Sequence, residues 1–195
     1  LTLITTSGGL GGTTFLAING AGVLATANYL PKSLMFTTSN LAGQVVWDGG
    51  AGTNNWATAA NWSGNAVPVA ANNVYIGSDS GGVAISSGSQ AANALTSKSD
   101  LTLSAGSLTI SGASALGGAL NLSAGTLTAN GATALASLAF SGGTLNGAAD
   151  LTLSGASIWS GGTMSGTGTT TIASGATLDI SGATFKTINT RLLDN

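Results

Sequence analysis

The strongest constraint on the fold of this chain is an internal repeat. Residues 101–109 (LTLSAGSLT) recur 19 positions later as residues 120–128 (LNLSAGTLT). Related segments follow at residues 138–145, 151–155 and 170–180. Self-similarity at a short period is typical of solenoids, in which each repeat buries its apolar side against its neighbours.

Each repeat has the same local pattern. A short segment of alternating leucine and threonine is followed by Ser-Ala-Gly or Ser-Gly-Gly and then by a second alternating segment. Alternation places one row of side chains inside and the other outside. The frequent glycines disfavour long helices and indicate sharp corners. We therefore predict an all-β protein, a parallel β-helix (β-solenoid) with coils of about 19 residues that stack about 4.8 Å apart.

The first part of the chain departs from this pattern. Residues 1–6, 14–18 and 33–38 read as three longer strands separated by turns, so we expect residues 1–44 to form an N-terminal β-strand segment. We expect this segment to contact a neighbouring copy of the chain. The β-helix is predicted over residues 45–195, with residues 45–76 as its tryptophan-rich start.

Composition excludes several kinds of chemistry. The 195 residues include no His and no Cys, six acidic residues that are all Asp, and four basic residues. A His-based acid–base pair, a thiol nucleophile and a Cys/His zinc site are therefore impossible. Four bases are too few to follow a phosphate backbone, so we expect no nucleic-acid partner. No apolar run reaches the roughly 18 residues of a membrane span. We expect no enzyme activity, no cofactor and no bound metal ion.

The densest motif lies at the start of the predicted β-helix. Its parts are residues 46–50 (VWDGG), 54–56 (NNW), 61–62 (NW), Pro68 and residues 74–76 (VYI). Here the chain resembles bacterial surface proteins of the autotransporter-associated β-strand-repeat and filamentous-haemagglutinin-like kind. Their arrays often open with W-D-G-G, N-W and a proline before V-x-I strands.

The resemblance covers nearly the whole chain. Residues 101–180 are similar to the LTLSGGTLT-type coils of such arrays, and residues 1–40 loosely resemble the closing segment of a preceding array. It implies a secreted bacterial protein outside the cell or on its surface. It also implies a parallel β-helix with a role in adhesion, biofilm matrix or surface structure, and no enzyme activity.

Trp47, Trp56 and Trp62 allow two interpretations. Their rings could stack on the apolar face of a sugar, which would make them a contact site for surface glycans. Alternatively, they cap the first coil while Asp48, Asn55 and Asn61 bond to turn backbone. The capping interpretation is favoured, because aromatic rings beside turn-forming residues more often close a core.

The acidic residues do not form an obvious catalytic pair. Asp100 and Asp150 both precede a Leu-Thr-Leu-Ser segment. If they occupy equivalent corners, three coils separate them by roughly 14 Å at the strand spacing. Glycosidase carboxylates lie about 5 to 9.5 Å apart, so a structural role is expected for both. Asp79, in a Gly- and Ser-rich turn, offers too few oxygen ligands for calcium.

The ends of a solenoid expose strand edges, which soluble solenoids cover with polar or charged devices. This chain instead places apolar residues near both ends, so we predict that it associates there with copies of itself or with adjoining repeats of a longer chain. The residues expected at this contact are Leu1, Leu3, Ile4, Phe15, Phe36, Ile188, Leu192 and Leu193. A net charge of −2 provides little repulsion against association.

These observations favour one function and leave two alternatives. The favoured hypothesis is a non-catalytic structural protein of an extracellular bacterial fibre, matrix or surface layer that associates end to end by β-stacking. The first alternative is a carbohydrate-binding adhesin that uses the tryptophan-rich segment. The second is a polysaccharide-degrading β-helix enzyme, which the scarcity of charged residues disfavours.

Overall fold

The structure, a computed structural model, describes residues 23–30, 33–40 and 43–195. The chain divides into two compact units, Leu1–Ala42 and Gly43–Asn195. In the first unit, β1 (Val23–Leu30) and β2 (Ser33–Asn40) pair antiparallel. The strand expected at residues 33–38 lies within β2, whereas those expected at 1–6 and 14–18 lie outside the described residues.

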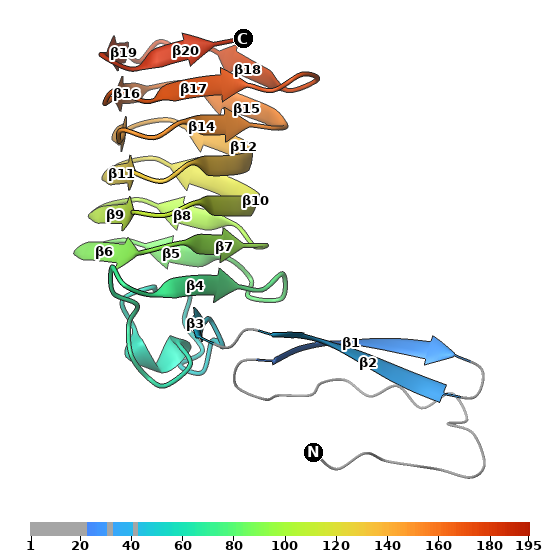
Figure 1. Cartoon of the computed structure of the whole chain (residues 1–195). Coiled ribbons are helices and arrows are strands. Elements are labelled where there is room, and N and C mark those ends of the chain that lie inside the picture. Colours follow the sequence, from blue (N-terminus) through green and yellow to red (C-terminus); the bar gives the residue numbers. More distant parts are fainter. Residues whose placement is uncertain (1–22, 31–32, 41–42) are drawn as a thin grey trace. The chain divides into compact units, whose positions relative to one another are not determined.

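The second unit is a β-solenoid of about six turns, and its coils are about 19 residues apart. Figure 1 shows the turns stacked in chain order from β4 to β20. The strands of successive turns pair in parallel, and each sheet therefore runs along the axis of the stack. The predicted fold class, an all-β parallel β-helix with this coil length, is confirmed. One short 3₁₀ helix, η1 (Ala59–Asn61), interrupts the β-structure near the start.

Each turn contributes one strand to each of three faces, which we call A, B and C. Face A contains β3 (Gln44–Val46), β4 (Asn73–Ile76), β7 (Leu95–Ser97), the first parts of β10 (Ser114–Leu122) and β12 (Thr133–Phe140), β14 (Leu151–Leu153), β17 (Thr169–Ile172) and β20 (Leu192–Asp194). Face B contains β5 (Val83–Ile85), β8 (Leu101–Leu103), the second parts of β10 and β12, β15 (Ala156–Trp159) and β18 (Thr177–Ile180). Face C contains β6 (Ser89–Ala92), β9 (Ser107–Ile110), β11 (Thr126–Ala129), β13 (Thr144–Asn146), β16 (Gly162–Ser165) and β19 (Lys186–Asn189).

Face A is the one that the sequence pattern misses, since the repeat shows two strands per coil. Some of its inward positions are polar: Ser114 and Thr133 are buried. Their hydroxyls donate to the carbonyls of Gly112 (3.0 Å) and Gly131 (2.8 Å) in the preceding corner. These hydrogen bonds offset the free-energy cost of burying the hydroxyl groups. Face A can therefore be buried without the alternating leucines that mark the other two faces.

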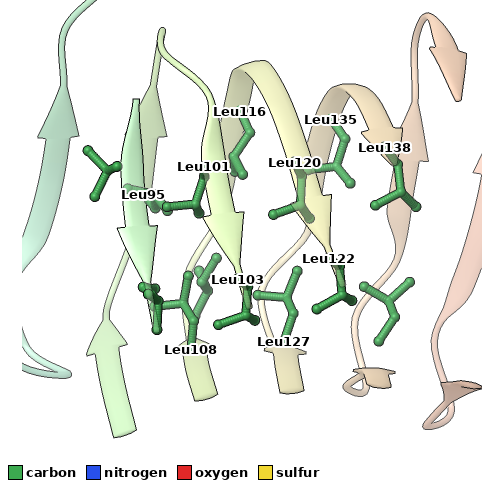
Figure 2. Packing of buried hydrophobic residues seen from close by; sticks show 14 of the residues in the cluster. Leu95, Leu101, Leu103, Leu108, Leu116, Leu120, Leu122, Leu127, Leu135 and Leu138 are labelled. Atoms are coloured by element: carbon green, nitrogen blue, oxygen red, sulfur yellow. The ribbon is translucent and has the colours of Figure 1, made fainter. Parts of the chain in front are cut away.

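The solenoid core consists of apolar side chains stacked in register from turn to turn (Figure 2). On face B, Leu101 pairs with Leu120, which pairs in turn with Leu138. On face C, Leu108 pairs with Leu127 in the same way. These leucines are at most 1% exposed. Full burial of one such side chain contributes about 2 kcal/mol, so each added turn gains both apolar contacts and a ladder of backbone hydrogen bonds.

The corner between faces B and C explains the glycine of the repeat. Gly106, Gly125 and Gly143 have φ values of 70°, 76° and 79°. A Cβ on Gly125 would also lie 2.5 Å from the carbonyl oxygen of Gly106 in the turn below. That carbonyl accepts a 2.9 Å hydrogen bond from the N–H of Thr126. Glycine is therefore required twice, for its backbone conformation and for the close approach of stacked corners.

Candidate functional site

The N-terminal end of the solenoid is closed by residues 47–63, which we call the tryptophan cap (Figure 1). Trp56 and Trp62 are fully buried, and Trp47 is 7% exposed. The ring of Trp62 lies edge-on to both others, with centroid distances of 4.9 Å to Trp47 and 4.7 Å to Trp56. Its indole N–H donates to the carbonyl of Trp56 at 2.7 Å. The three rings thus form one packed plug, in which the indole N–H of Trp62 is hydrogen-bonded and that of Trp56 is buried without a partner.

Asn61 organises the polar side of the tryptophan cap. Its fully buried amide accepts a hydrogen bond from the N–H of Ala51 at 3.1 Å and donates to Thr53 Oγ1 at 2.9 Å. It also donates to the carbonyl of Asn55 at 3.1 Å. The amide therefore holds the loop before Trp56 in place. The expected bonding of Asn61 and Asn55 to turn backbone is confirmed, since the Asn55 side chain accepts from the N–H of Ala57 at 3.0 Å.

The tryptophan cap also occupies the outer edges of the first strands. On face A, the N–H of Ser63 donates to the carbonyl of Val46 at 2.8 Å, and the N–H of Val46 donates to Ser63 Oγ at 2.9 Å. On face B, the N–H of Ala84 donates to the carbonyl of Asn54 at 2.7 Å, and the N–H of Trp56 donates to the carbonyl of Ala84 at 2.9 Å. Backbone groups of β3 and β5 that another strand could have bound are therefore already used.

The burial of the tryptophan rings bears on the glycan hypothesis. A sugar-stacking platform needs an aromatic face open to solvent. Trp47, Trp56 and Trp62 are all buried, and each ring packs against another. The arrangement fits the capping interpretation and gives a sugar no ring face to bind. Glycan contact at these residues stays a prediction without support from the geometry.

Asp100 and Asp150 lie at different corners, so the assumption that they are equivalent was wrong. Asp100 precedes face B, whereas Asp150 precedes face A, because Leu151 pairs with Thr133. Each carboxylate accepts a hydrogen bond from a backbone N–H of the next turn, Ala119 at 2.8 Å and Thr169 at 2.9 Å. Both side chains therefore join successive turns, a structural role. Within the described residues, no three His, Cys, Asp or Glu side chains group closely enough to hold a metal ion.

The C-terminal end of the solenoid differs from the N-terminal end. On face B, the inward row continues from Trp159 (2% exposed) to Ile180, which is 54% exposed. On face C, the inward row continues from Met164 (1% exposed) to Ile188, which is 46% exposed. Both isoleucines occupy core positions of their rows. They are exposed because, in the part of the chain that the structure describes, no further turn lies over them.

The backbone edges at the C-terminal end are likewise uncovered within the described residues. Among the described strands, β18 pairs with β15, β19 with β16 and β20 with β17, and each has its other edge free. Phe185, in the corner between β18 and β19, is 93% exposed. We call the last turn, residues 177–195, the open end. It combines three free strand edges with exposed apolar side chains.

The predicted association residues fall into three groups. Ile188 and Leu192 (62% exposed) lie at the open end, and Leu193 beside them is partly buried. Phe36 lies in β2, in register with Ala27 of β1. The other four lie outside the described residues: Leu1, Leu3, Ile4 and Phe15. Sequence reasoning missed Ile180 and Phe185, although the alternation of residues 177–180 would have shown Ile180 as an inward position.

Arg191 holds the open end to the turns below it, and sequence reasoning also missed this residue. Its side chain is buried, and its Nε donates to Thr170 Oγ1 at 2.7 Å. Its terminal nitrogens donate to the carbonyls of Gly147 (3.3 Å), Ala149 (3.2 Å) and Thr169 (3.1 Å). Burial lowers the pKa of the guanidinium below its usual value, and the charge of nearby Asp150 opposes that shift.

Comparisons of the chain with protein-family models, curated proteins and solved structures found no match. The resemblance to autotransporter-associated and filamentous-haemagglutinin-like proteins therefore stays a prediction from the motifs. Among the described residues, no helix is long and apolar enough to cross a membrane.

Proposed function

We propose that this chain is a non-catalytic structural module of an extracellular bacterial fibre, matrix or surface layer, which associates end to end by β-stacking with copies of itself or with adjoining repeats of a longer chain. The observation that carries the proposal is the exposure of core positions at the open end. Ile180 and Ile188 lie in rows whose preceding members are at most 2% exposed from the second turn onward. A further stacked turn would bury both side chains and pair the free strand edges.

The construction of the solenoid supports a mechanical role. The rows of leucine and the parallel ladders repeat with the same register over several turns. Each turn contacts its neighbours alone, so the module can be extended without changing its interior. The buried tryptophans and the backbone-bonded aspartates fit structural tasks rather than chemistry on a substrate.

Secretion and membership of the autotransporter-associated or filamentous-haemagglutinin-like proteins are part of the same proposal. Their support is the run from residues 46–50 through Pro68 to residues 74–76, followed by the glycine-cornered coils. A chain without cysteine also suits export in an unfolded state, since no disulfide can form too early. Immunolabelling of intact producing cells with an antibody to the solenoid tests the location. Signal confined to permeabilised cells would contradict it.

Light scattering and electron microscopy of the purified chain at neutral pH, without added ligand, test the association. We expect particles heavier than the 18.6 kDa monomer, elongated along the solenoid axis. A monomer that stays dispersed at all concentrations would overturn the proposal of end-to-end stacking.

A further inference from the structure

We infer that the outer surface of face C binds ice, through a two-dimensional array of hydroxyl groups that the solenoid holds in register. This surface lies on the side of the solenoid, in its middle turns, and is separate from both ends of the stack. Ice binding is therefore an activity beyond the proposed end-to-end association, and the two can be tested independently.

The array is made of outward side chains from β9, β11, β13 and β16. Figure 1 shows β9, β11 and β16 above one another on one side of the stack. Each of the four strands contributes two outward residues, one on either side of a buried inward residue such as Leu127. The first ladder consists of Ser107, Thr126, Thr144 and Thr163. The second ladder consists of Thr109, Thr128, Asn146 and Ser165. We call these residues the hydroxyl array.

Within the described residues, the outer surfaces of the other two faces are different. β8 on face B and β14 on face A have a single outward residue each, Thr102 and Thr152. The outward row of face B continues from Thr102 through Asn121 and Ala139 to Ile158, so it mixes polar and apolar groups. Two polar ladders run side by side over four successive turns on face C. The pairing of strands, rather than a fixed period, reveals them, since members of the first ladder are 19, 18 and 19 positions apart.

The backbone sets the spacing of the hydroxyl array. Neighbouring strands lie about 4.8 Å apart, and alternate residues of one strand lie roughly 6.6 Å apart. Both spacings are close to distances that recur between water molecules on the surfaces of hexagonal ice. Threonine is stiff about χ1, so its hydroxyl and methyl groups keep their positions above the sheet. The buried residues beneath hold the strands in place. The array is therefore rigid and periodic in two directions.

The hydroxyl groups of the array are available to water. In the part of the chain that the structure describes, one side-chain hydrogen bond joins members of the array, from Ser165 Oγ to Asn146 Oδ1 at 3.3 Å. Every position of the array is partly exposed. A hydroxyl group both donates and accepts hydrogen bonds, as a water molecule in ice does. Water ordered on the array can therefore continue the lattice of a crystal.

The chemistry of face C favours ice over other partners. β9, β11, β13 and β16 contain no charged residue and no aromatic residue. A polyanion finds no complementary charge on these strands, and a sugar ring finds no aromatic face to stack on. Uncharged methyl and hydroxyl groups complement a lattice that is itself neutral.

The size of the array disfavours a second protein chain as its partner. Four neighbouring strands of about four residues cover roughly 19 Å by 13 Å. That area is about a third of the roughly 800 Å² that each partner contributes to a standard protein–protein interface. Ice requires no encounter with a rare partner, because its molecules are the solvent around every copy. Many weak contacts with one rigid lattice also add together.

Capture by growing ice tests the inference. The full chain is mixed with a globular protein of similar mass that has no affinity for ice, and ice is grown slowly on a cooled probe. We expect the chain to be enriched in the ice relative to the reference protein. We also expect its solution to freeze below the temperature at which the ice melts, because bound protein blocks growth of the crystal surface.

Matched substitutions locate the contact. Thr128→Lys places a long charged side chain within the array and should abolish the enrichment. Thr102→Lys is the control, because Thr102 is also a partly exposed outward threonine but lies on face B. Thr144→Lys, in the other ladder and the next turn, is a second variant if Thr128→Lys does not fold. Circular dichroism checks the fold of all three variants.

The possible outcomes separate the alternatives. Enrichment that the array variants lose and Thr102→Lys retains would support the inference. Absence of enrichment, or equal behaviour of the array variants and Thr102→Lys, would overturn it. A chain that pellets with microcrystalline cellulose or chitin instead, with the same dependence on the array, would assign the surface to a crystalline polysaccharide and overturn ice binding. Light scattering measures end-to-end association separately, so failure of one proposal leaves the other standing.

Discussion

The two ends of this solenoid finish the same rows of side chains in opposite ways. On face C, the inward row begins with Gln90, which is 9% exposed, and ends with Ile188, which is 46% exposed. At the first end β3 and β5 are bonded to the tryptophan cap and β6 has a free edge, whereas at the last end β18, β19 and β20 each have one edge without a partner among the described strands. A repeating core therefore does not by itself close a solenoid. Residues outside the repeat close the N-terminal end, and no described residue lies over the last turn.

The comparison also predicts where the molecule is least stable. The inward-facing residues of a middle strand such as β10 are buried, whereas no residue of β18, β19 or β20 is buried. Segments with few buried apolar contacts open at the lowest free energy. The open end should thus exchange its amide hydrogens first, unless a second copy covers it.

The largest effect is expected at the closed end. Trp62→Ala removes a fully buried ring, its contacts with two other rings and one hydrogen bond. We expect a loss of about 4 kcal/mol in the free energy of unfolding, typical of a buried aromatic residue replaced by alanine. Denaturant unfolding followed by circular dichroism measures it. Val69→Ala, at a residue that is 58% exposed, should change stability by less than about 0.5 kcal/mol. Equal losses in the two variants would contradict a closing role for Trp62.

A pair of glycine substitutions compares a covered corner with an uncovered one. Gly125 and Gly175 both have positive φ, 76° and 82°. A Cβ on Gly125 would meet the carbonyl oxygen of Gly106 at 2.5 Å, whereas a Cβ on Gly175 has no neighbour within 4 Å. Gly125→Ala should cost about 3 kcal/mol, since overpacking adds to the backbone strain. Gly175→Ala should cost about 1 kcal/mol from the backbone alone. Thermal unfolding of both variants provides the comparison, and a Gly175→Ala loss as large as that of Gly125→Ala would show that backbone strain alone sets the cost.

A smaller, local effect is expected from Arg191→Met. The variant loses the hydrogen bonds to Thr170 Oγ1 and to three carbonyls, and it also removes a buried charge. We expect the opening free energy of residues 169–195 to fall by about 1 to 2 kcal/mol, which is a roughly tenfold faster amide exchange. Exchange at the tryptophan cap should stay unchanged. Lys186→Met is the control, and uniform faster exchange along the whole solenoid would argue against a local clamp.

The smallest effect concerns salt. Charged residues make up 5% of the chain, and the open end has no net formal charge. Screening therefore has few interactions to weaken. Dissociation of the associated copies, measured by sedimentation between about 0.05 and 0.5 M salt, should change less than about threefold. A strong salt dependence would show that charged groups rather than apolar rows hold the contact.

Much of the fold could be predicted because the repeat is local and regular. Alternating leucines mark faces B and C, and the corner glycines mark the turn between them. The clustering of Trp47, Trp56 and Trp62 likewise indicated a cap. Face A was missed because buried Ser114 and Thr133 replace apolar residues there. The corner of Asp150 was misplaced for a related reason, since residues 151–154 repeat the motif of another face.

The sequence thus predicted the repeat period, the inward and outward rows and the sharp corners. The rows and corners depend on residues a few positions apart, and the period is visible as direct repetition of the motif. The face to which each segment belongs, the closure of one end and the clamp of Arg191 were not predicted. They depend on contacts between residues 17 to 44 positions apart, such as Ser63 with Val46 and Arg191 with Gly147. The same short motif can stack on any face. Its register is chosen by burial and hydrogen bonding over the whole stack, which exist once the chain has folded.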